Sequence, residues 1–117
     1  MKTAKVNVQQ HDAGPVICVR GEIDLSNSDA LRGDILAAVP PDGPGIVLDL
    51  TDTTYLDSSG VRLLFELAEL MQRHRQRLVL VVSEEALIRR VVVLTKLDDA
   101  VAVVETVDAG LAALAPV

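Results

Sequence analysis

The sequence has 117 residues, half of them apolar, and a formal net charge of −6. This length predicts a single domain, residues 1–117, with one hydrophobic core. The acidic balance argues against nucleic acid as a partner, because phosphate backbones would be repelled. No apolar stretch reaches the length of a membrane-spanning helix, and the start of the sequence lacks the apolar run of a secretory signal. We therefore expect a cytoplasmic protein with no membrane association.

Cys18 is the only cysteine, so it cannot form an internal disulfide, and its apolar neighbours favour a buried structural thiol. The sequence contains no metal-ligand spacing and no glycine-rich phosphate loop. We therefore expect no metal ion, no cofactor and no catalytic residue. The oligomeric state stays open between a monomer and a weak dimer.

The chain is predicted to open with two paired strands. Apolar and polar residues alternate over 6–10, residues 12–15 have turn chemistry, and 16–19 form a short apolar run. Gly21 is expected to end this pair of strands. A helix follows, because candidate N-cap residues at 26–28 precede apolar residues at helical spacing. The prolines at 40–41 stop this helix.

The middle of the chain is predicted to contain a buried strand and a long helix. Residues 46–48 are branched and bounded by turn residues, which is typical of a central strand ending at Asp49. A loop of Thr and Asp residues is expected next. From Gly60 onward, apolar residues recur at helical spacing on one face and charged residues on another, which makes this the clearest helix in the sequence.

The last third of the chain is predicted to continue the alternation of strands and helices. Residues 78–82 read as a second buried strand, and Ser83 as the N-cap of a helix whose apolar face carries Leu87, Val91 and Leu94. Residues 101–104 form a short strand and 109–115 a terminal helix. The predicted order is β-β-α-β-α-β-α-β-α, an α/β fold with a mixed, mostly parallel central sheet and helices packed against it.

The segment Asp57-Ser58-Ser59-Gly60 carries the chemistry of interest, since it places a serine at or beside the start of the long helix. A serine there is most often a plain N-cap, contributing about 1 kcal/mol. It could also accept a phosphoryl group, because the helix N-terminus favours an anion. That group would add ~1.5 to 2 negative charges at the surface. The residues alone leave open which serine, if either, is modified.

Four stretches stand out: Gly21-Glu22-Ile23-Asp24, the strand at 46–49, the segment Tyr55-Leu56-Asp57-Ser58-Ser59-Gly60-Val61, and the apolar helix leading to Leu94-Thr95-Lys96-Leu97. Together they resemble the STAS domain of bacterial anti-sigma factor antagonists. The resemblance implies a STAS-like single domain and a partner switch. The unphosphorylated chain would bind an anti-sigma factor with serine kinase activity and so release a sigma factor. Phosphorylation would end this binding, and a metal-dependent serine phosphatase would restore it.

The resemblance also implies roles for particular residues. The phosphoacceptor would be Ser58, the residue directly after the aspartate. The partner-binding surface would include Asp24 in the facing loop and the start of the long helix, namely Asp57, Ser59, Gly60, Val61, Arg62 and Leu64. Two positions depart from the family, because Lys96 and Arg62 stand where relatives commonly have glycine. We expect a differently shaped loop at Lys96 and an added cation near the phosphorylation site at Arg62.

Three other readings compete with the partner switch. A serine hydrolase would need a base, and His11 and His74 lie in a predicted strand end and a predicted helix end. A response-regulator receiver could use Asp49 as its phosphoacceptor, but the acidic pair and the late Lys-Pro of receivers are absent. A non-switching STAS module that regulates a transporter or serves as a stress-complex scaffold would share the fold.

Overall fold

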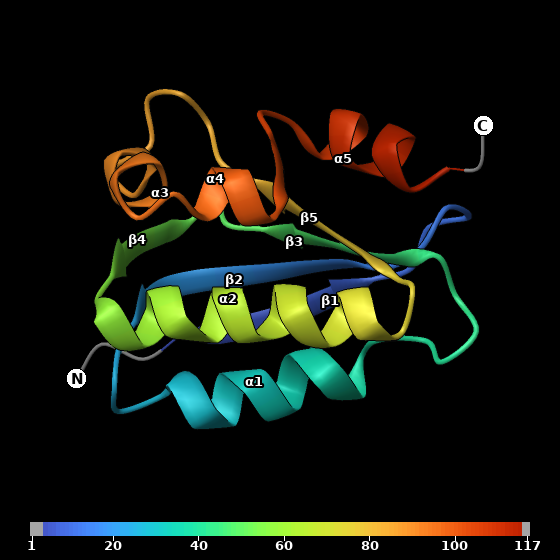
Figure 1. Cartoon of the computed structure of the whole chain (residues 1–117), viewed down its shortest axis with the longest axis horizontal. Helices are drawn as coiled ribbons and strands as arrows, with labels where there is room; N and C mark the ends of the chain where they lie inside the picture. Colours follow the sequence, from blue (N-terminus) through green and yellow to red (C-terminus); the bar gives the residue numbers. More distant parts are fainter. Residues whose placement is uncertain (1–3, 116–117) are drawn as a thin grey trace.

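A computed structural model describes residues 4–115. Its helices and strands follow one another as β1 (Lys5–Gln9), β2 (Val16–Ile23), α1 (Ser28–Ala37), β3 (Gly45–Asp49), β4 (Thr53–Leu56), α2 (Ser58–Arg73), β5 (Arg77–Val81), α3 (Arg89–Leu94), α4 (Leu97–Ala100), β6 (Ala102–Val104) and α5 (Val107–Leu114). The helices α1 and α2 lie side by side on one side of the sheet, and α5 lies on the other (Figure 1).

The sheet is mixed and mostly parallel, as predicted. Its strand order is β1-β2-β3-β5-β6, with β4 pairing only with β2. The strand β1 runs antiparallel to β2, and the pairs β2–β3, β2–β4, β3–β5 and β5–β6 are parallel. No helix within residues 4–115 is both long enough and apolar enough to cross a membrane.

The two central strands, β3 and β5, are buried on both faces. In β3, Ile46 and Leu48 point into the larger core beneath α1 and α2, whereas Val47 points into the smaller core beneath α5. In β5, Leu80 and Val81 divide between the two cores in the same way. Successive side chains of a strand point to opposite faces, so a strand covered on both sides needs an unbroken apolar run. This is why both strands were recognisable from the sequence.

The strand β2 changes partner along its length. Its first half pairs with β3 from Val16 to Cys18, and its last residues pair with β4 from Gly21 to Ile23, with an irregularity next to Gly21. Gly21 has a φ of 107°, a conformation that glycine adopts without the steric cost of a side chain. The prediction that Gly21 ends the opening pair of strands is confirmed, because the pairing of β1 with β2 stops at Arg20, while β2 itself continues through this kink to Ile23.

The strand β4 corrects a second prediction, which assigned its residues to a loop. Thr53 and Leu56 are buried, whereas Thr54 and Tyr55 face solvent. The strand therefore has no continuous apolar run, and its Thr and Asp neighbours look like a loop in the sequence. Its pairing with β2 brings Leu56 beside Ile23 and delivers the chain to the start of α2.

The region after β5 differs from its prediction as well. A turn, rather than a helix, follows Ser83, and the helix α3 begins only at Arg89. Leu87 and Leu94 were expected on the buried face but are 79% and 70% exposed. Ile88 and Val92 are the buried residues instead. Because α3 starts later than predicted, a different set of positions faces the core. The short helix α4 was not predicted.

Candidate functional site

The candidate site lies where the C-terminal ends of β2 and β4 meet the N-terminal ends of α1 and α2. The backbone N–H of Asp57 donates to the carbonyl of Ile23 at 3.2 Å, which ties the start of α2 to the end of β2. The chain leaves β2 through residues 24–27 and enters α1 at Ser28. Two segments that are far apart in sequence therefore share one end of the sheet.

Asp57 is the N-cap of α2, and both of its carboxylate oxygens are used. Oδ1 accepts from the backbone N–H of Ser59 at 2.8 Å and of Gly60 at 3.0 Å. Oδ2 accepts from the backbone N–H of Leu25 at 3.2 Å. The carboxylate thus satisfies orphan donors of the helix and also holds the loop between β2 and α1. The cap of this helix is an aspartate, so neither serine is needed for that role.

The two neighbouring serines have different surroundings. Ser58 is the first residue of α2 and is exposed, and its hydroxyl makes no hydrogen bond to any residue of the described chain. Ser59 is half-buried and faces a groove between α1 and α2. A kinase active site needs an accessible hydroxyl, and Ser58 offers one at no structural cost. Exposure therefore favours Ser58 on grounds independent of the family resemblance.

Gly60 permits the close approach of α2 to the end of β2. A Cβ atom at this position would lie 2.9 Å from Leu56 Cδ2, 3.0 Å from the Ile23 carbonyl oxygen and 3.1 Å from Ile23 Cγ2. Such distances are shorter than carbon contacts in a packed interior allow. Gly60 is consequently a packing glycine that sets where Ser58 stands relative to the sheet.

The loop between β2 and α1 is held by its own polar residues. The Asp24 carboxylate accepts from the Ser26 backbone N–H at 2.9 Å, and the Asn27 side chain accepts from the Asp24 backbone N–H at 3.1 Å. The side chain of Leu25, between them, is 78% exposed. Because Asp57 fixes the Leu25 backbone, this leucine is an apolar side chain held in solvent next to Ser58. Such a residue is typical of a docking surface.

A groove of about 240 Å³ lies between the first turns of α1 and α2. Its lining includes Leu25, Arg32, Ser59, Arg62 and Glu66. Arg32 donates to the Glu66 carboxylate at 2.6 Å across the groove and lies 3.7 Å from Asp29. Arg62 makes no hydrogen bond or ion pair within the described residues. We call this feature the α1–α2 groove.

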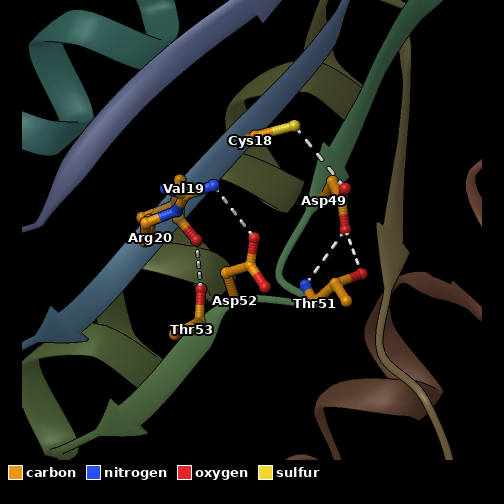
Figure 2. A network of polar contacts seen from close by, with 7 residues as sticks. All are labelled: Cys18, Val19, Arg20, Asp49, Thr51, Asp52 and Thr53. Carbon is orange, nitrogen blue, oxygen red and sulfur yellow. Dashed lines mark hydrogen bonds and ion pairs between the residues drawn. The ribbon is translucent and has the colours of Figure 1, made fainter.

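A polar network supports the segment that leads from β3 into β4. Figure 2 shows the Asp49 carboxylate accepting from the Thr51 backbone N–H at 3.0 Å and from the Cys18 thiol at 3.5 Å. Thr53 donates its hydroxyl proton to the Val19 carbonyl at 2.8 Å in a buried bond. The Thr53 bond holds β4 against β2, and the Asp49 bonds join the end of β3 to β2 and to the loop that leads into β4.

Cys18 is half-buried, and burial raises the pKa of its thiol above the ordinary cysteine value, with the negative charge of Asp49 adding to the effect. A raised pKa keeps the sulfur protonated and unreactive. This environment matches the expected structural thiol. It lies within the network behind the site and away from the exposed serine.

The structure brings together most residues that the sequence assigned to partner binding. Asp24, Asp57, Ser59 and Arg62 lie around Ser58 or line the α1–α2 groove. Leu64 lies apart from this surface, since it is 0% exposed and packs in the larger core. Its assignment to a docking face does not fit this burial, because α2 turns that position toward the sheet. Two further residues also lie apart from the surface: Gly60 is buried, and Val61 is half-buried against the core.

Two exposed apolar residues of this region, Leu25 and Tyr55, were not predicted from the sequence. Tyr55 is 49% exposed on β4, two residues before the cap. A lone leucine between polar loop residues was the available signal for Leu25, since a loop has no core-facing periodicity to explain it. Tyr55 was not recognised because residues 53–56 were assigned to a loop and not to a strand with one exposed face.

The loop at Lys96 keeps a glycine-like conformation. Lys96 has a φ of 61° and precedes α4, so the chain takes a left-handed turn there despite the side chain. Whether this loop differs in shape from that of the relatives stays a prediction. Left-handed backbone costs about 1–2 kcal/mol for a non-glycine residue, which the surrounding helices must offset.

The arrangement offers no hydrolase geometry at Ser58. His74 is the C-cap of α2, 16 positions after Ser58 along the same helix, which corresponds to about 24 Å. His11 lies in the turn between β1 and β2. Within residues 4–115 no group of three His, Cys, Asp or Glu side chains is placed to hold a metal ion.

Comparison with known proteins agrees with this geometry. Residues 5–110 match the family model of the STAS domain. The chain is similar to the crystal structure of an anti-sigma factor antagonist from Mycobacterium paratuberculosis, with 31% identity, a TM-score of 0.84, and coverage of 96% of this chain and 94% of that chain.

Two further structures share the fold at lower identity. The unphosphorylated anti-sigma factor antagonist SpoIIAA is 19% identical, with a TM-score of 0.72 and coverage of 94% of this chain and 96% of that chain. SLC26A9 is 13% identical, with a TM-score of 0.70, and the match covers 86% of this chain but 19% of that chain. The fold therefore occurs both alone and inside a larger protein. On the family model and the 31% identical relative, this chain belongs to the STAS domain family.

Proposed function

We propose that this chain is an anti-sigma factor antagonist that is switched by phosphorylation of Ser58. Unphosphorylated, it binds an anti-sigma factor with serine kinase activity, which then releases its sigma factor. A metal-dependent serine phosphatase removes the phosphate and restores the unphosphorylated, binding form of the chain. The observation that supports this proposal most is the pairing of an exposed, unbonded Ser58 hydroxyl with a helix cap supplied entirely by Asp57.

The reaction at Ser58 is an ordinary phosphoryl transfer. The Ser58 oxygen forms a bond to the γ-phosphorus of ATP, the bond from that phosphorus to the bridging oxygen breaks, and ADP leaves. The hydroxyl proton passes to a base of the kinase. Because the hydroxyl makes no bond within the described chain, the product keeps the cap and the fold.

The docking surface then changes in charge while its shape is retained. Ser58 directly follows Asp57, whose carboxylate accepts from the backbone N–H of the exposed Leu25, and Asp24 lies in the same loop as that leucine. Phosphorylation adds ~1.5 to 2 negative charges to this apolar and already acidic edge. An apolar partner surface would have to desolvate the phosphate to bind, which disfavours the complex.

Mass-spectrometric mapping after incubation with the kinase and ATP tests the assignment. We expect one phosphate, on Ser58, in the wild-type chain and in a Ser59→Ala variant, and none in Ser58→Ala. Phosphate on Ser59 alone, or on no residue, would refute the proposal.

One alternative is a module that is not switched and that regulates a transporter or serves as a stress-complex scaffold, since the fold also occurs as a small part of a longer chain, SLC26A9. The absence of phosphate on Ser58 in the mapping experiment would favour this alternative. The fold by itself does not separate the two functions.

A further inference from the structure

Ser58 and Arg62 stand four residues apart in the first two turns of α2. Side chains at positions i and i+4 of a helix lie on the same face, with Cβ atoms about 5–6 Å apart. Both residues are exposed. An anionic group on Ser58 would therefore lie within reach of the Arg62 guanidinium, which a long and flexible side chain carries.

The Arg62 guanidinium is available for a new contact. It makes no hydrogen bond or ion pair within the described residues, although it lines the α1–α2 groove. The other arginine of this groove, Arg32, is already paired with Glu66 and lies near Asp29. Of these two arginines, only Arg62 can bind a phosphate on Ser58 without first breaking an existing ion pair.

The neighbouring carboxylates do not compete strongly for Arg62. Asp57 accepts three backbone N–H bonds, and Asp24 accepts from the loop that contains it. Glu66 and Asp29 face Arg32. These four groups, with the two arginines, are the charges that α1, α2 and the connecting loop present around Ser58 and the groove. The unphosphorylated site thus has one cation without a counter-ion among several satisfied anions.

We propose that a phosphoryl group on Ser58 captures Arg62 as an intrahelical ion pair and so withdraws this cation from the α1–α2 groove. The proposal rests on the proposed phosphorylation of Ser58. The order of the two residues is the favourable one, because the anion on Ser58 lies nearer the N-terminus of α2 than the cation of Arg62. Arginine also matches phosphate geometry with two parallel N–H bonds. Phosphorylation then does two things at the docking surface, since it adds an anion and removes the unpaired guanidinium.

The test uses the full chain with phosphoserine installed at position 58 by genetic encoding, without a kinase. The second ionisation of the phosphate, near pH 6 in a free phosphoserine, is followed by ³¹P NMR. A nearby cation favours the dianion, so its pKa should be lower in the wild-type chain than in Arg62→Gln, by about 0.3 pH unit. Arg62→Lys should keep part of this shift, because lysine retains the charge but not the paired N–H geometry.

Arg73→Gln provides the matched control, because it removes the same charge from the same helix. Arg73 is the last residue of α2 and pairs with Glu69, about 22 Å along the axis from Ser58. Its substitution should leave the phosphate pKa unchanged. Equal pKa values in Arg62→Gln and in the wild-type chain, or equal shifts in Arg62→Gln and Arg73→Gln, would overturn the proposal.

A thermal measurement gives a second readout on the same proteins. Arg62→Gln should lower the melting temperature of the phosphorylated chain more than that of the unmodified chain, by about 1–2 °C. An equal effect on both forms would show that Arg62 acts without the phosphate and would contradict the pair. Because no kinase is used, these outcomes are separate from the mapping experiment, which alone tests whether a kinase modifies Ser58.

Discussion

The carboxylate of Asp57 accepts a hydrogen bond from the backbone N–H of Leu25 at 3.2 Å, although the two residues are 32 positions apart. The same carboxylate caps α2 through Ser59 and Gly60. One side chain therefore fixes the start of the helix that carries Ser58 and the loop that presents the exposed leucine. Asp57 therefore fixes the positions of Ser58 and Leu25 relative to each other.

Removing this carboxylate should loosen both segments. Asp57→Ala is expected to lower the free energy of unfolding by about 1–2 kcal/mol, since an N-cap and a tertiary acceptor are lost together. Asp57→Asn keeps an acceptor oxygen and should lose less. Urea denaturation measures the stability, and hydrogen exchange at the Leu25 amide reports the loop. Unchanged exchange in Asp57→Ala would contradict the role assigned to this bond.

Two helical glycines should respond to alanine in opposite directions. Gly60→Ala is expected to cost about 1–3 kcal/mol, because its Cβ would meet Ile23 and Leu56 at 2.9–3.1 Å. Gly33 in α1 has no atom within 4 Å of the same position. Gly33→Ala should therefore stabilise the chain by up to about 1 kcal/mol through helix propensity. Thermal unfolding of the two variants compares them, and a stabilised Gly60→Ala would refute the packing argument.

Leu25 should contribute to partner binding without contributing to stability. Leu25→Ala is expected to raise the dissociation constant of the complex with the anti-sigma factor about tenfold or more. Its free energy of unfolding should change by less than about 0.5 kcal/mol, because the side chain is 78% exposed. Val8→Ala, on β1 and opposite the beginning of β2, is the control and should leave binding unchanged. Equal affinities for Leu25→Ala and the wild type would remove this leucine from the docking surface.

The Cys18 thiol should react slowly with alkylating reagents. Burial, and after it the charge of Asp49, raises its pKa, so at mildly alkaline pH the folded chain carries less thiolate than the unfolded chain. Asp49→Asn should speed alkylation several-fold, and Asp52→Asn should speed it less. Because the folded pKa is the higher one, this group's contribution to stability is present below the ordinary thiol pKa and is lost as pH rises through the folded value. Alkylation as fast as in denatured protein would contradict this environment.

The sequence predicted the parts of the fold whose residues carry a strong local pattern. The strands β3 and β5 are apolar throughout because helices cover both of their faces, and α2 shows a long amphipathic repeat. The strand β4 was missed because Thr54 and Tyr55 face solvent and its only partner is the end of β2. Short or one-sided elements take their structure from tertiary pairing, which a local pattern does not contain.

The candidate site was predictable to a similar extent. The Asp-Ser-Ser-Gly segment marked the start of α2, but the residues alone did not show that Asp57 supplies the cap and leaves Ser58 unbonded. The bond from Leu25 to Asp57 joins segments that are distant in sequence, so no spacing rule could reveal it. Leu64 was assigned to the surface along with the start of α2, although its place in the apolar repeat of this helix matches its burial in the core.

The most direct test of the account is calorimetric binding of three forms of the chain to the anti-sigma factor kinase. These are the unmodified chain, the chain with phosphoserine at position 58, and a control with phosphoserine at position 59. We expect the unmodified chain to bind and phosphorylation of Ser58 to weaken binding about a hundredfold or more. Equal affinities for the unmodified chain and the chain phosphorylated on Ser58 would contradict the switch.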